Sequence, residues 1–238
     1  MPHHCGRLGE GLNSKCKQPF NKLTSFIILM LCSFSTIYAA NYDANKLGNL
    51  ANLRYGQHAY NDVQELNRLI INLKSASEAD KLQQVNDFFN QKINFIDDID
   101  VWKQTDYWAT PLESLGRQAG DCEDFSIAKY IILQLVNVDN DKLRLTYVRA
   151  NLSSSGQSAV RAHMVLSYYP SPQAEPLILD NLTPEILPAS SRKDLFPIFS
   201  FNKKGIWVGS SNKPKGEAES NLSRWRDVLS RIRADGIE

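Results

Sequence analysis

The sequence predicts an α+β fold in which N-terminal helices pack on an antiparallel sheet. Apolar residues recur at helical spacing over residues 63–73 and 82–93. From residue 143 onward, the pattern changes to short apolar runs separated by turn residues, which is typical of strands. Helices followed by antiparallel strands, without regular alternation, indicate the α+β class.

The helical half contains two recognisable helix starts. Ser77-Glu78-Ala79-Asp80 resembles a capping box, so a helix is expected over the apolar positions that follow it. A further helix is expected to begin at or beside Cys122 and to end at Asn137 or Asp139. The acidic, aromatic stretch between these helices, residues 97–113, is interpreted as an ordered loop.

The second half is expected to form strands over residues 143–148, 160–169, 177–180 and 205–208, with a hairpin loop at 153–157. Period-two alternation places His163, Val165 and Ser167 on one face of the second strand. Apolar residues from Leu222 to Ile232 at helical spacing predict a closing helix.

Residues 1–40 are typical of a secretory signal peptide. Lysines at 15, 17 and 22 precede an apolar run at 26–34, and Tyr38-Ala39-Ala40 ends the segment with small residues. The run is short for a membrane span, which needs roughly 20 apolar residues. We therefore expect one exported domain covering residues 41–238.

The charge balance argues against polyanionic partners. The whole chain has 27 basic and 26 acidic residues, and residues 41–238 have 23 basic and 25 acidic. A nearly neutral domain gives no electrostatic reason to expect nucleic acid or an anionic membrane as a partner.

Cys122 is the only cysteine after residue 40, so it has no intrachain disulfide partner there. A catalytic thiol needs a base and a group that orients the base. His163 lies between apolar residues in a predicted strand, and Asp180 ends the next apolar strand, whereas His58 lies in a polar, surface-like stretch. The alternative is structural: a core cysteine, a buried histidine with its hydrogen bonds satisfied, and an aspartate that begins a turn.

The acids beside Cys122 oppose its reactivity. Asp121 and Glu123 raise the pKa of a neighbouring thiol, whereas a helix N-terminus favours the thiolate. Asp121 is also a suitable N-cap residue, so these acids have a purely structural explanation as well.

Two motifs, Trp108–Pro111 and Gly120–Phe125, together with His163 and Asp180, resemble the bacterial transglutaminase-like cysteine proteinases, and among them the LapG-type periplasmic proteases. The resemblance implies a papain-like, transglutaminase-like core. It also implies that Cys122 is the nucleophile, His163 the general base and Asp180 the acid that orients it.

The same resemblance implies a calcium ion held by Asp121 and Glu123, with Asp124 as a lesser candidate. Calcium takes six to eight oxygen ligands, so backbone carbonyls, for example from residues 108–110, and water are expected to complete the site. The spaced acidic pattern of an EF-hand is absent from the sequence.

The resemblance further implies a function: calcium-dependent cleavage of the N-terminal region of a large, repeat-containing surface adhesin at a small-residue site. Cleavage would release the adhesin and promote biofilm dispersal. The periplasmic domain of an inner-membrane cyclic-di-GMP receptor would inhibit the protease. Two alternatives use the same residues: a protein transglutaminase with a Cys-His-Asp triad, and a non-catalytic calcium-binding adaptor.

Overall fold

The computed structural model describes residues 41–154, 157–209 and 213–238. The predicted signal peptide lies outside these residues, as do positions 155–156 of the predicted hairpin loop. Within the described ranges, no helix has the length and apolar character needed to cross a membrane.

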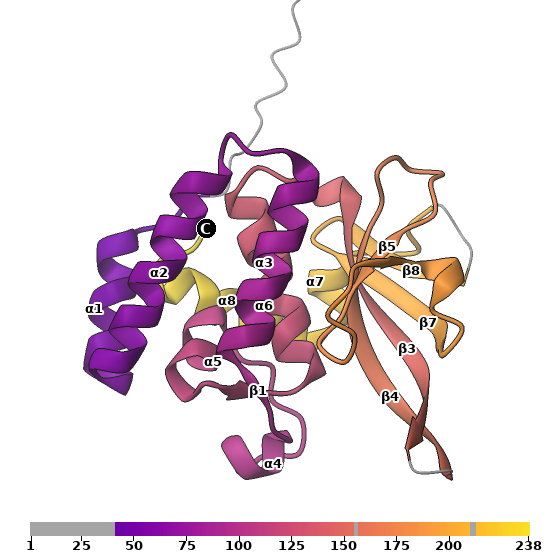
Figure 1. Ribbon diagram of the computed structural model, residues 1–238, viewed down its shortest axis with the longest axis horizontal. Helices are drawn as coiled ribbons and strands as arrows, with labels where there is room; N and C mark the ends of the chain where they lie inside the picture. Colours follow the sequence, from indigo (N-terminus) through magenta and orange to yellow (C-terminus); the bar gives the residue numbers. More distant parts are fainter. Residues whose placement is uncertain (1–40, 155–156, 210–212) are drawn as a thin grey trace, which may run out of the picture. The chain divides into compact units, whose positions relative to one another are not determined.

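The helices dominate the first half and return at the end of the chain (Figure 1). Two single 3₁₀ turns, at Asn140–Lys142 and Ala189–Ser191, join other elements. The α-helices are α1 (Ala44–Tyr55), α2 (Gln57–Leu73), α3 (Glu78–Lys92), α4 (Asp98–Val101), α5 (Pro111–Arg117), α6 (Cys122–Leu135), α7 (Ala218–Asn221) and α8 (Ser223–Ala234).

Among the described residues, the strands form two sheets. A six-stranded antiparallel sheet has the order β6-β5-β4-β3-β7-β8, and a small parallel pair joins β1 to β2. The predicted α+β class is confirmed. The strands are β1 (Asn94–Phe95), β2 (Ala119–Gly120), β3 (Leu143–Ser154), β4 (Gln157–Tyr168), β5 (Leu177–Leu179), β6 (Leu187–Pro188), β7 (Leu195–Asn202) and β8 (Gly205–Val208).

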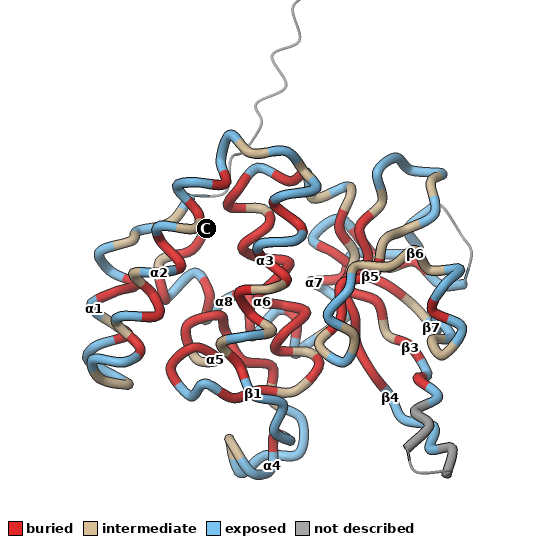
Figure 2. The backbone as a smooth tube through the Cα atoms, viewed as in Figure 1, coloured by how far each residue is buried: buried red, intermediate tan, exposed pale blue. Residues whose placement is uncertain are grey.

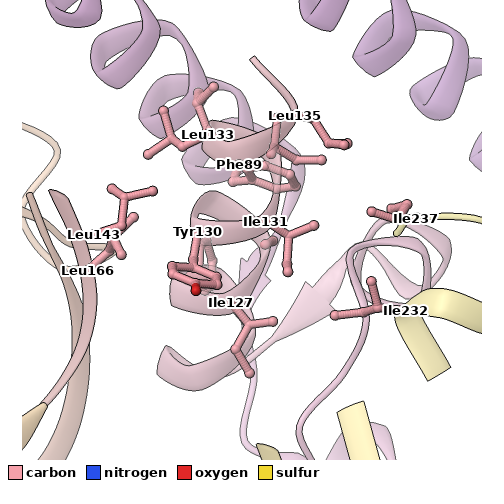
Figure 3. Close-up of a cluster of buried hydrophobic side chains, with 14 of the residues drawn as sticks. Phe89, Ile127, Tyr130, Ile131, Leu133, Leu135, Leu143, Leu166, Ile232 and Ile237 are labelled. Atoms are coloured by element: carbon pink, nitrogen blue, oxygen red, sulfur yellow. The ribbon is translucent and has the colours of Figure 1, made fainter. Parts of the chain in front are cut away.

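Helix α6 is the centre of the core. It lies between α3 and the large sheet, and it is buried along nearly its whole length (Figures 1 and 2). A helix that is apolar on most sides is stable only when neighbours cover all of those sides. Figure 3 shows sheet residues Leu143 and Leu166 on one side of α6 and Ile232 and Ile237 from the C-terminal region on the other. The start of α6, with Cys122, is therefore held firmly.

Several predicted boundaries need correction. The segment expected to be a loop contains α4 and the start of α5, because Thr110 forms a capping box with Glu113 and Pro111 occupies the first turn. Helix α6 ends at Leu135, two residues before the expected range, and Asn137 then takes a left-handed conformation.

Other predictions hold. Ser77 caps α3 by accepting a hydrogen bond from the Asp80 amide, and the closing helix is α8.

The strand pattern missed β7, because Pro197 interrupts it. The register of β7 against β3 shifts between Tyr147 and Val148, which accommodates that irregularity.

Candidate active site

The turn before α6 fixes the position of Cys122. Asp121 is the N-cap, and its side chain accepts a hydrogen bond from the Glu123 amide at 3.3 Å. Asp124 completes the capping box by accepting from the Asp121 amide at 3.2 Å. Cys122 is therefore the first residue of the helix, where unpaired backbone amides and the helix dipole favour negative charge.

The first turn of α6 contacts the free edge of β4. Strand β5 pairs with β4 only at residues 166–168. Beyond that point, the Met164 amide donates to the Cys122 sulfur, and the Ser126 hydroxyl donates to the Met164 carbonyl at 3.1 Å. His163 directly precedes Met164 in β4. The predicted nucleophile at the start of α6 therefore contacts the residue that follows the predicted base.

His163 and Asp180 are in direct contact. His163 Nε2 and Asp180 Oδ1 are 2.8 Å apart, and both residues are buried. Burial alone would raise the pKa of the Asp180 carboxyl, but hydrogen bonds from His163, Leu182 and Arg192 outweigh it and hold that pKa at about 2. Asp180 is therefore ionised at neutral pH and is a strong acceptor for the imidazole.

Two cationic residues that the sequence did not predict support Asp180. Arg192 donates from Nη2 to Asp180 Oδ2 at 2.8 Å, and Lys129 of α6 donates to the Asp180 carbonyl at 3.1 Å. Arg192 follows β6 in a polar stretch, and Lys129 lies within an apolar helix. The only signal in the sequence was Lys129, a charged residue in a helix predicted to be buried, because a buried charge requires a partner.

Carboxylates gather on the other side of Cys122. Ligand atoms from Asp98, Asp121 and Asp124 lie within 4.8 Å of one another, and so do atoms from Asp121, Cys122 and Glu123. Asp98 was missed because α4 was taken for part of a loop. Its position follows from β1: Phe95 pairs with Gly120 in the parallel ladder, so the chain three residues later lies beside the start of α6.

Asp98 has one oxygen without a partner. Its Oδ2 accepts a hydrogen bond from the Tyr107 amide, whereas its buried Oδ1 has no hydrogen-bond partner among the described residues. Burial raises the pKa of Asp98 to about 6. Burial, with the charge of Glu123 next, raises the pKa of Asp121 to about 10, and burial raises that of Asp124 well above its ordinary value. At neutral pH, Asp121 and Asp124 therefore hold protons unless positive charge compensates them, whereas Asp98 is mostly ionised.

The thiol is held by one of the acids. Cys122 donates to Glu123 Oε2 at 2.8 Å, and the Tyr147 hydroxyl donates to Glu123 Oε1 at 3.2 Å. Burial, together with the negative charges of Glu123 and Asp121, raises the pKa of the thiol. The structural explanation was that Asp121 and Glu123 only cap the helix. Asp121 does cap it, but the Glu123 side chain accepts hydrogen bonds from the thiol and from Tyr147 instead.

The donor set suits a hard cation. Asp98, Asp121 and Asp124 offer only carboxylate oxygens, which calcium prefers as ligands. One of these oxygens, Asp98 Oδ1, is buried and accepts no hydrogen bond from the described residues. Residues 108–110 were expected to offer backbone carbonyl oxygens to the calcium ion, but the structure shows a different contact. Their contact with the cluster is the Ala109 amide, which donates to Asp124 at 2.7 Å, while the Trp108 carbonyl accepts from Arg231.

His58, the other histidine after residue 40, is exposed on α2, as expected from its polar surroundings. Its Nε2 lies 3.1 Å from the Gly116 carbonyl, and the hydrogen bond fixes a surface side chain. The thiol at the helix start, the buried His163–Asp180 pair and the acidic cluster thus form one constellation, in which His58 has no part.

Comparison with known families decides the identity. The family model for bacterial transglutaminase-like cysteine proteinases matches residues 51–211, more than half of the chain. The chain is a bacterial transglutaminase-like cysteine proteinase. The comparison with curated proteins gives no match.

Solved structures agree with the family. This cysteine proteinase is 39% identical to Legionella pneumophila LapG. The EGTA-treated LapG structure gives a TM-score of 0.69, with 82% of this chain and 100% of that chain covered. The calcium-bound LapG structure gives 0.66, with 80% and 99% covered. The resemblance stated from the sequence is confirmed, and the transglutaminase-like core and cysteine protease activity follow from it.

Proposed function

We propose that this cysteine proteinase hydrolyses peptide bonds with Cys122 as nucleophile, His163 as general base and Asp180 as the acid that orients the base. One observation carries the assignment. A cysteine proteinase needs a cysteine, and Cys122 is the only one after residue 40. Its sulfur accepts a hydrogen bond from the amide next to His163, which in turn contacts Asp180.

The hydrogen bonds set the direction of proton transfer. His163 uses Nε2 for Asp180, so Nδ1 is the nitrogen left to take the thiol proton. The sulfur then attacks the substrate carbonyl carbon, and His163 returns the proton to the leaving amine as the C–N bond breaks. His163 next takes a proton from water, and the resulting hydroxide attacks the thioester carbonyl. The C–S bond then breaks, the carboxylic acid product leaves, and His163 returns its proton to the Cys122 sulfur.

We propose that Asp98, Asp121, Glu123 and Asp124 hold a calcium ion beside this nucleophile. The buried Asp98 oxygen without a partner and the all-oxygen donor set support the proposal, as does the similarity to a calcium-bound LapG structure. When bound, calcium supplies positive charge that offsets the carboxylates. With or without calcium, the Met164 amide and the start of α6 position the thiol.

Calorimetric calcium titration tests the metal site. We expect Asp98→Asn to weaken calcium binding about tenfold or more, because calcium affinity depends on the number of charged ligands. Asp100→Asn is the matched control, since Asp100 is exposed on the same short helix. Equal affinity in the wild type and Asp98→Asn would remove Asp98 from the site. Proteolysis by an Asp121→Ala, Glu123→Ala protein in chelator would refute the calcium requirement.

We also propose the biological role that the LapG-type resemblance implies. The protein is exported to the periplasm by residues 1–40 and cleaves the N-terminal region of a large, repeat-containing surface adhesin, which promotes biofilm dispersal. The periplasmic domain of an inner-membrane cyclic-di-GMP receptor binds the protease and inhibits it. The signal-like pattern of residues 1–40 and the 39% identity to LapG support this role.

Cleavage of an adhesin's N-terminal fragment tests substrate and triad together. We expect the wild type to cleave with calcium and not with chelator, and the added receptor domain to suppress cleavage. Cys122→Ala and His163→Ala should be inactive, while His58→Ala, the matched histidine control, should retain activity. Cleavage by Cys122→Ala would refute the assignment. Incorporation of a labelled amine into a glutamine peptide would indicate a transglutaminase instead.

A further inference from the structure

A cavity of about 160 Å³ opens on the large sheet away from α6. Thr146 and Val148 of β3 line it with Val165 and Ser167 of β4. These residues alternate with Leu145, Met164 and Leu166, which pack in the main core around α6. The cavity therefore lies on the opposite face of the sheet from the nucleophile's helix. Neither Cys122 nor His163 lines it.

An arginine without an ion pair among the described residues gives the cavity its charge. Arg144 and Arg192 line it, and no Asp or Glu is among the described residues that do so. The Arg144 guanidinium stacks between the rings of Tyr169 and Trp207, at 4.5 and 4.2 Å from their centroids. Within the described part of the chain, Arg144 forms no salt bridge, so its charge is balanced only by aromatic faces.

Both arginines have buried donors that are not used. Arg192 is 5% exposed; its Nε and Nη2 bind Asp194, and Nη2 also binds Asp180. Its Nη1 is buried and has no hydrogen-bond partner among the described residues, and the same holds for Nε of Arg144. A buried N–H group without an acceptor is costly, and guanidinium groups only donate. Both arginines of the cavity lining therefore have hydrogen-bonding capacity that the described residues leave unused.

The rest of the lining restricts the ligand further. The hydroxyls of Thr146 and Ser167 lie 2.8 Å apart and bond to each other, and Val148, Val165 and Ile178 supply apolar walls. A cavity of roughly 150 Å³ holds a benzene-sized molecule. A compact anion with an apolar body satisfies both the arginine donors and these walls.

We propose that this cavity binds a small monocarboxylate with a compact apolar body, its carboxylate accepting from the free arginine donors. Charge-assisted hydrogen bonds between guanidinium and carboxylate are the strongest that this lining offers. The apolar body lies against the valine and isoleucine side chains. Arg192 connects the cavity wall to Asp180, but neither Cys122 nor His163 lines the cavity, so the existence of this binding site does not depend on the proposed function.

Calorimetric titration of the full domain with benzoate tests the proposal, with neutral benzamide as the matched ligand. We expect benzoate to bind at about millimolar affinity or tighter, as nine heavy atoms allow. Benzamide should bind at least tenfold more weakly. Because both ligands are compared on the wild-type protein, this result does not depend on any variant that fails to fold.

Variants then locate the binding. Arg144→Gln removes the unpaired charge and should weaken benzoate binding at least tenfold, and Ile178→Phe should block binding by filling the cavity. Arg149→Gln is the control, because Arg149 is exposed on the same strand and faces Phe196 outside the cavity. Far-UV circular dichroism confirms that each variant is folded. Absence of benzoate binding to the wild type, equal binding of benzamide, or unchanged binding by folded Arg144→Gln each overturns the proposal.

Discussion

Asp180 gives a sharp prediction about acid stability. Its carboxyl has a pKa of about 2, against an ordinary value of 3.8, because hydrogen bonds from His163, Leu182 and Arg192 outweigh the effect of burial. As the pH falls, the unfolded chain binds a proton at this carboxyl before the folded protein does. The stabilisation is therefore present above pH 4 and is lost as the pH falls towards 2.

The magnitude follows from the two pKa values. A difference from 3.8 to about 2 corresponds to about 2.4 kcal/mol of unfolding free energy at neutral pH. About 1 kcal/mol of this is lost between pH 7 and pH 3. Asp180→Asn has no titrating group at this position. We therefore expect the variant's deficit in unfolding free energy to be about 1 kcal/mol larger at pH 7 than at pH 3.

Urea unfolding followed by circular dichroism at pH 7, 5 and 3, in chelator, measures the deficit. Asp227→Asn is the matched control, because Asp227 is exposed and pairs with Arg231 on the same helix. Its unfolding free energy should track the wild type at all three pH values. A deficit for Asp180→Asn that is the same at pH 7 and pH 3 would refute the buried, ionised state of Asp180.

Three other substitutions test the packing around α6. Burial lowers the pKa of Lys129 to about 7, so the wild type should gain stability as the pH rises from 7 to 10, and Lys129→Met should lose this dependence in urea unfolding. In Gly120→Ala, the new Cβ would lie 2.6 Å from Asp124 Oδ2, so the unfolding free energy should fall by about 1–3 kcal/mol. Calorimetry should also show that this variant binds calcium more weakly. Ile131→Ala should lower the unfolding free energy by about 2–5 kcal/mol, because Ile131 is buried in the main core.

Local patterns predicted the elements that carry the thiol and the histidine. Asp121 was recognisable as a helix N-cap, which put Cys122 at a helix start. Alternation along β4 placed His163, and Asp180 followed the next strand in the chain. Because β4 and β5 are sequential and pair antiparallel, the short connection between them brings these two residues together.

The parts that could not be predicted depend on long-range pairing. Asp98 reaches the cluster because β1 pairs with β2, and two strands of two residues leave almost no periodic signal. Arg192 reaches Asp180 after the chain has passed through β6 and a 3₁₀ turn. Neither spacing nor residue type indicates such contacts, since any exposed aspartate or arginine would look the same in the sequence.

After burial, which raises the pKa of the Cys122 thiol most, Glu123 is the charged group that most opposes formation of the thiolate. A helix N-terminus favours a charge by about 1 kcal/mol, whereas two like charges 4 Å apart repel by about 4 kcal/mol near a protein surface. Glu123 accepts a hydrogen bond directly from the thiol at 2.8 Å, so its charge destabilises the thiolate by more than the helix N-terminus stabilises it. We therefore expect Glu123→Gln to be alkylated by iodoacetamide several-fold faster than the wild type in chelator, with Glu185→Gln, an exposed glutamate, unchanged. Mass spectrometry follows the reaction cleanly, because residues 41–238 contain one cysteine. Equal rates for the wild type and Glu123→Gln would mean that another group controls the thiol.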